Sequence, residues 1–265
     1  KLSAGLEERY DYLEPPASIK GQTASDNTEA IYLQDELQLI KMLHITAGLR
    51  LNRNESFGWR LTPKLSAMLK VRDLRIRASW SQGFKTPTLK ELNYQYARDM
   101  NGMILFLGNP NLKPQTSNYF SINAEYTIGH FNISATGYYN KLGDMITLVT
   151  IPNSEAPDVY REQYGEMLSK VRRYMNMDNA KTFGADVTLR YTTDNLSLGA
   201  GYSYLDTDAN IFDTTHDKMM NVVIDGMAHH KGNIFATWNH NISPSYNLGI
   251  GLYGKFSTKR YYQTN

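Results

Sequence analysis

The sequence contains no cysteine among its 265 residues, which excludes a disulfide framework, a thiolate metal site and a cysteine nucleophile. It also lacks an excess of one charge, because 28 Lys and Arg stand against 26 Asp and Glu, for a net charge of +2. So small an imbalance, with no basic run, gives no reason to expect a nucleic-acid partner. No apolar run approaches the length of a membrane helix. The chain therefore offers neither thiol chemistry nor a helical span.

Period-two alternation of apolar and polar residues is the dominant pattern. In the segment HFNISATGYYN, Phe131, Ile133 and Tyr139 share one face, whereas Asn132 and Ser134 share the other. The alternation predicts about eleven strands of about ten residues, whereas strands of globular proteins average about five or six. A tilted strand needs about nine to eleven residues to cross a bilayer. The 19 tyrosines beside only 9 phenylalanines suit strands whose ends lie between apolar and wet surroundings.

Short and long connections alternate along the chain. Tight turns are expected at 40–42, 71–73, 128–129, 193–194 and 243–245. Long connections are expected at 12–28, 83–116, 141–182 and 206–228, with a shorter one at 52–57 and a weak helical segment at 160–175. Tight turns at one end and long loops at the other are typical of a membrane barrel with periplasmic turns and extracellular loops. A soluble antiparallel β-sandwich is the alternative, since alternation also fits a sheet with one wet face.

Ten segments in order carry a family resemblance: IYLQDELQL, HITAGLRL, LTPKLSAML, LRIRASWSQGFKTPTLKEL, GNPNLKP, NAEY, ISATGYYNKLGDMI, NAKTFGADVTLRY, AGYSYLDT and AHHKGN. Together they resemble the C-terminal barrel part of a TonB-dependent outer-membrane receptor, from about Ile31 to Tyr262. The resemblance implies an all-β, antiparallel, up-and-down transmembrane β-barrel, with residues 1–265 supplying part of a wall of 22 strands. We expect the chain to be a piece of a longer protein, because neither end looks natural.

The same resemblance implies a function and its partners. The receptor would lie in the bacterial outer membrane among its lipids, bind a small-molecule metal chelate outside and import it actively. A plug domain, absent from these residues, would fill the barrel and contact a TonB-type energy-coupling protein in the periplasm. A passive porin-like channel is the alternative within the barrel class, and a β-sandwich adhesion module is the alternative outside it. No acid–base pair or catalytic triad is recognisable, so we predict no enzyme activity and no catalytic residue.

The connection 83–116 is too long for an ordinary connector, and loops of this length are usually functional or disordered. Its FKTP and NPNL sequences resemble paired boxes of haem receptors, which favours haem as the transported ligand over a ferric siderophore or cobalamin. Those receptors carry a histidine between the boxes, and this chain has none there. Prolines stiffen both feet of the loop, leaving the part between them for binding. The predicted ligand-binding residues are Tyr94, Tyr96, Arg98, Met103 and Phe106, with His216 in another long loop as a candidate axial ligand.

The segment LDTDANIFDTTHD spaces Asp206, Asp208 and Asn210 like the start of a calcium loop, with Asp217 at the twelfth place. Ile211 stands where such a loop requires glycine, so a solvated loop is the favoured interpretation and no resident metal is predicted. His229 and His230 are assigned structural roles near a family turn. Four basic residues alternate with outward ones and are expected to line the lumen: Arg75, Arg77, Arg190 and Lys255.

Overall fold

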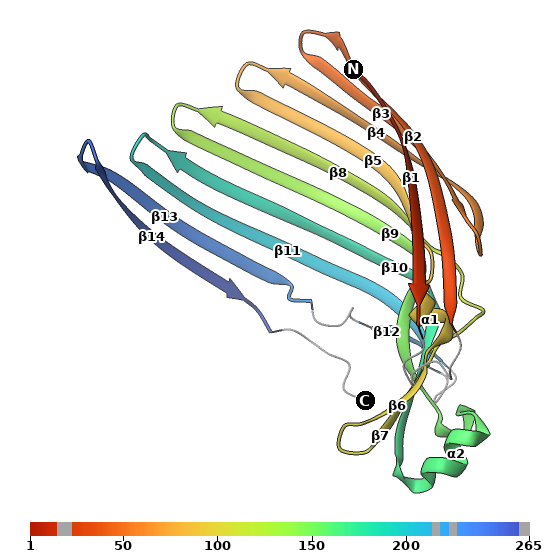
Figure 1. Cartoon of the computed structure of the whole chain (residues 1–265). Coiled ribbons are helices and arrows are strands. Elements are labelled where there is room, and N and C mark those ends of the chain that lie inside the picture. The colour runs from red at the N-terminus through yellow and green to blue at the C-terminus, as the bar shows by residue number, and fades with distance from the viewer. Residues whose placement is uncertain (15–22, 214–217, 223–226, 260–265) are drawn as a thin grey trace.

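The structure is a computed structural model that describes residues 1–14, 23–213, 218–222 and 227–259, without side-chain detail at 178–179, 209–213 and 218–222. Long, tilted strands form one curved sheet, like a section of a barrel wall (Figure 1). Tight turns join the strands at one end, here called the turn end. Two short helices and a small hairpin gather at the other, here called the loop end. No helix among these residues is long and apolar enough to cross a membrane.

The strands are β1 (Leu2–Leu13), β2 (Ala24–Ile40), β3 (Leu43–Asn54), β4 (Gly58–Val71), β5 (Leu74–Lys85), β6 (Gln95–Asp99), β7 (Met103–Leu107), β8 (Gln115–Ile128), β9 (Phe131–Ile151), β10 (Leu168–Thr192), β11 (Leu196–Asp213), β12 (Lys218–Val222), β13 (His230–Ser243) and β14 (Tyr246–Ser257). The helices are α1 (Leu89–Asn93) and α2 (Asp158–Tyr164), with 3-10 turns at Asn153–Glu155 and Gly165–Met167.

The strands of the wall follow chain order, β1-β2-β3-β4-β5-β8-β9-β10-β11-β13-β14, with the short strands β6, β7 and β12 off this path. Every pair along this path is antiparallel. The path holds eleven strands, which confirms the predicted up-and-down sheet and the positions of all five tight turns. Among the described residues, β1 and β14 form open edges, so the sheet does not close on itself.

The two faces of the wall differ as the alternation predicts. Ile133 on β9 stands opposite Tyr126 on β8 and Leu189 on β10, and all three side chains are exposed on the convex, outward face. On the other face, the Asn123 amide donates to the hydroxyls of Ser134 and Thr136, at 2.9 and 2.8 Å. An apolar face left exposed beside a hydrogen-bonded polar face is what a barrel wall in lipid requires.

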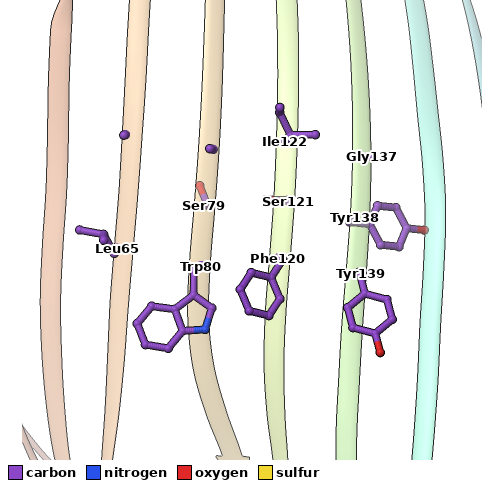
Figure 2. Close-up of a pocket in the computed structure, with 11 residues that line it drawn as sticks. Leu65, Ser79, Trp80, Phe120, Ser121, Ile122, Gly137, Tyr138 and Tyr139 are labelled. Atoms are coloured by element: carbon purple, nitrogen blue, oxygen red, sulfur yellow. The ribbon is translucent and has the colours of Figure 1, made fainter.

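Outward aromatic side chains form rows across neighbouring strands. Trp80, Phe120, Tyr139 and Phe183 stand opposite one another in register on β5, β8, β9 and β10. Figure 2 shows three of them, Trp80, Phe120 and Tyr139, side by side. Phe131 and Tyr191 form a second row nearer the turn end. From Tyr139 to Phe131 is about eight residues of β9, or about 26 Å of strand. Two such rows are the aromatic girdles that flank the apolar band of a membrane barrel.

The strands are longer than predicted. The prediction of a loop over 141–182 is wrong for much of that segment, which is strand. β9 continues to Ile151 and β10 begins at Leu168, so only 152–167 connects them. Likewise β1 and β2 reduce the loop 12–28 to 14–23, and β11 runs to Asp213. The weak helix at 160–175 exists only as α2 and its 3-10 turn, after which the chain is strand. The reason is that these extensions lie beyond the aromatic row, where loops cover them and simple alternation is lost.

Candidate functional site

Two connections fold together at the loop end: 86–114, between β5 and β8, and 152–167, between β9 and β10. The first begins with α1, which is capped by its own side chains. The Thr88 hydroxyl accepts from the Glu91 amide at 3.2 Å, and the Glu91 carboxylate accepts from the Thr88 amide at 2.7 Å. Lys85, the last residue of β5, forms an ion pair of 2.6 Å with the same carboxylate. This capping box fixes where the chain leaves the wall.

The hairpin of β6 and β7 extends the sheet sideways at the loop end. β6 pairs with β7 antiparallel, and β7 adds to the start of β10 in parallel, with Leu105 opposite Val171. The Ser169 hydroxyl donates to the Met103 carbonyl at 3.0 Å beside this pairing. The hairpin is therefore hydrogen-bonded into the wall instead of hanging free in solvent.

One face of this hairpin packs on α2 and builds the largest core among the described residues. Leu105 and Val171 have no exposed surface, and Leu107, Ile151, Ala156, Tyr160 and Leu168 complete the cluster. The Tyr160 hydroxyl donates to the Gln95 carbonyl at 3.1 Å, which links α2 to β6. Burial raises the pKa of Tyr160, and nearby Tyr164 adds to the effect. The loop end is thus a folded unit with its own hydrophobic interior.

The opposite face of the hairpin gathers three of the predicted binding residues. Tyr96 stands opposite Phe106, and their rings stack with centroids 5.3 Å apart, while the Tyr94 ring lies 5.7 Å from Tyr96. We call Tyr94, Tyr96 and Phe106 the aromatic face. The Lys90 ammonium lies 5.9 Å from the Tyr94 ring centroid. The face therefore combines aromatic surface with positive charge at its edge.

The remaining predicted residues lie elsewhere. Arg98 is exposed on the same side of the hairpin as Tyr96, two residues further along β6. Met103 belongs to the opposite side and packs against the core cluster. Period-two alternation within MILFL already assigns Met103 and Phe106 to opposite faces of the strand, so this difference was predictable from the sequence. His216 lies outside the described residues.

Sequence reasoning missed two residues of β10 beside the aromatic face. Arg172 stands opposite Phe106 in the parallel ladder, and its Nε is buried without a hydrogen-bond partner among the described residues. Tyr174 is the next residue on that side of β10. Burial raises the pKa of Tyr174, with further contributions from the Glu91 carboxylate and from Tyr94. The sequence pattern predicts a weak helix over 160–175, and a helix there gives no reason to expect Arg172 and Tyr174 beside the aromatic face.

The NPNL box has a structural role in this fold. The Asn109 side chain donates to the Tyr174 carbonyl at 3.1 Å, and its amide donates to the Glu91 carbonyl at 2.9 Å. A Cβ on Gly108 would lie 2.6 Å from backbone atoms of Leu92 and Tyr94, so only glycine permits this close approach. The box therefore ties the foot of the loop to β10 and α1.

The other singled-out residues have ordinary partners. The His229 ring contacts the Leu205 carbonyl at 2.9 Å, and the His230 ring contacts the Tyr202 hydroxyl at 2.6 Å. Arg75 pairs with Glu125 at 3.0 Å on the lumen side. In the segment that resembles a calcium loop, Oδ1 of Asp206 lies 3.7 Å from Nδ1 of His229. Asp217 lies outside the described residues. No group of three or more His, Asp or Glu in the described part of the chain is placed to hold a metal.

A sheet with an outward apolar face, two aromatic rows and folded loops at one end is the wall of an outer-membrane β-barrel. The family described as TonB dependent receptor-like, beta-barrel matches residues 4–265. The chain belongs to this family of receptors. This finding sets aside the soluble β-sandwich and confirms the bacterial outer membrane as the location.

Individual relatives agree with this assignment. An iron-regulated outer membrane virulence protein of Vibrio cholerae serotype O1 (strain ATCC 39315 / El Tor Inaba N16961) is 29% identical over 209 residues, which are 77% of this chain and 31% of that protein. The vitamin B12 transporter BtuB of Photobacterium profundum is 27% identical over 207 residues, 78% of this chain and 30% of that protein. The chain thus spans about a third of the length of these curated relatives.

A solved structure shows the same fold. The siderophore receptor PirA of Pseudomonas aeruginosa superimposes with a TM-score of 0.72 at 20% identity, over 97% of this chain and 45% of that one. At this identity the similarity concerns the fold alone.

Proposed function

We propose that this chain forms part of the wall of a receptor that binds an iron chelate outside the cell and imports it with energy from a TonB-type periplasmic protein. Family membership and the iron-regulated relative support this proposal. The energy-coupling contacts would belong to a plug domain. The contribution of this chain is the loop end, which presents a preformed surface to the outside.

The aromatic face, flanked by Arg98 and Arg172, is the observation that carries the proposal. The Tyr96 and Phe106 rings stack and the Tyr94 ring lies tilted beside them, so together they offer aromatic surface to a chelate, and guanidinium groups attract carboxylates or phenolates. Arg172 stands opposite Phe106 in the parallel ladder, so its guanidinium supplies positive charge beside this face for an anionic ligand. A flat, anionic metal chelate matches both features.

Haem is the first candidate ligand, because its ring is flat and its propionates are anionic. Iron in haem accepts a tyrosine as its axial ligand in some proteins, and Tyr94 and Tyr96 supply phenols at this face. A ferric siderophore built on catechol rings shares the aromatic and anionic character and is the second candidate. Cobalamin is the third, on the strength of the vitamin B12 relative.

The experiment uses the full-length receptor with Y96A/F106A as the test variant. M100A is the matched control, because Met100 is exposed on the same hairpin outside the aromatic face. Binding of haem, followed by its Soret band, and of a ferric catecholate, followed by fluorescence quenching, should weaken at least tenfold in the double variant only. Binding of either chelate that is unchanged in Y96A/F106A would contradict a ligand role for this face.

The passive channel is tested separately. With haem or a ferric siderophore as sole iron source, growth should require both the receptor and the TonB-type protein. Growth that persists after removal of the TonB-type protein would favour a porin-like channel instead.

A further inference from the structure

An apolar groove of about 570 Å³ lies on the outward face of the wall. Leu65, Trp80, Phe120, Ile122 and Tyr139 surround it, and Gly137 forms part of its floor (Figure 2). Small residues on three strands, Ala67 on β4, Ala78 on β5 and Gly137 on β9, leave the floor of the groove open between larger neighbours. A Cβ added at Gly137 would meet only a methyl of Ile122, at 3.9 Å, so the space is open and a side chain fits.

Two lysines stand immediately beyond the aromatic row, toward the loop end. Lys141 on β9 is directly opposite Lys181 on β10, two residues past Tyr139 and Phe183. Both side chains are exposed, and neither forms an ion pair with any residue of the described chain. Directly opposite residues have Cβ atoms about 5 Å apart, and like charges there are destabilising. An anion between the two ammonium groups would remove that repulsion.

The neighbours of the lysine pair differ on its two sides. Across β8, Lys141 stands opposite Asn118, whose side-chain oxygen accepts from Gln82 at 2.9 Å, so that its amide nitrogen remains a donor. Across β11, Lys181 stands opposite Asp208, which offsets part of its charge. The positive potential is therefore strongest on the β9 side, directly above the groove.

The position of the pair indicates what occupies it. Aromatic rows mark the boundary between acyl chains and headgroups. Two residues further along the strand, about 7 Å, lies the level of lipid phosphates. Apolar groove, aromatic rim and lysine pair thus follow one another in the order of a lipid's acyl chain, glycerol or sugar backbone and phosphate.

We propose that this strip of β5, β8, β9 and β10 is a binding site for a phosphate-bearing lipid of the outer leaflet. An acyl chain fills the groove over Gly137, and the phosphate lies between Lys141 and Lys181. The site faces the membrane, so it is separate from the aromatic face and independent of which chelate is transported.

Native mass spectrometry of the full-length receptor with diphosphoryl lipid A as the probe tests the headgroup contact. Loss of two lysine–phosphate attractions in K141Q/K181Q should weaken binding about 30-fold. K141Q alone should weaken it more than K181Q, because Asp208 already offsets Lys181. K64Q is the matched control, since Lys64 faces the lumen opposite Ser81 and should leave binding unchanged.

Two further comparisons separate the parts of the site. G137L fills the groove and should weaken binding of the lipid even after its phosphates are removed, whereas the lysine variants should affect only the phosphorylated form. Unchanged heat-modifiable migration confirms that each variant is a folded barrel. Equal affinity of wild type and K141Q/K181Q for the phosphorylated lipid would overturn the proposal, as would equal affinity of wild type for the phosphorylated and dephosphorylated forms.

Discussion

Val187 tests the assignment of the two faces most directly. It lies on β10 midway between Phe183 and Tyr191, the residues of the two aromatic rows, and therefore at the centre of the apolar band. Its side chain is 45% exposed on the outward face. In a bilayer that exposure is to hydrocarbon, so V187R should lower the free energy of unfolding by about 2–4 kcal/mol. I133R, two residues from the row of Phe131, lies nearer the interface and should cost less.

The matched control is T188R on the same strand. Thr188 faces the lumen between Ser134 and Gly201, away from the hydrocarbon of the bilayer. Its cost should stay below about 1 kcal/mol. Guanidinium unfolding of the full-length receptor in phosphocholine vesicles, followed by tryptophan fluorescence, measures all three variants. Equal losses in V187R and T188R would refute the lipid–lumen assignment.

The remaining predictions concern orientation, ligand and loop stability. Because these 265 residues contain no cysteine, N101C and D194C each introduce the one thiol of this part of the receptor; on intact cells only N101C should react, and reaction of both would refute the orientation. If His216 is an axial ligand, H216A should abolish the Soret shift on haem addition, whereas an unchanged shift assigns the ligand elsewhere. Y160F removes the hydrogen bond to β6 and should open the 152–167 connection to proteolysis about fivefold more often, with the barrel unaffected. The raised pKa of Tyr160 means that its neutral form is stabilised by folding, so wild type but not Y160F should lose this protection above the ordinary tyrosine pKa of 10.0.

The wall was predictable because its signals are local. Alternation assigns each side chain to a face, and short breaks in it mark the turns, so the eleven-strand path and its tight turns needed no long-range information. The run from Met145 to Ile151 does not alternate, because loops cover one side of it and it lies beyond the lipid that selects an apolar outward face. It is nevertheless strand in the structure.

The site was predictable only in part. Tyr96 and Phe106 meet because they are opposite in a local hairpin, and their shared aromatic character made them candidates. Arg172 reaches them through parallel pairing between segments far apart in the chain, for which no local pattern exists. The strand number of the complete barrel and the plug remain predictions.

The parallel addition of β7 to β10 has a consequence for binding kinetics. If the aromatic face binds a chelate as proposed, the backbone ladders and hydrophobic interior that already hold the hairpin leave little chain to order, so the entropy cost of binding is small. Substitutions at the rings should then change the residence time of the chelate far more than its rate of capture. Under this proposal, a preformed surface would discriminate between chelates by their dissociation rates.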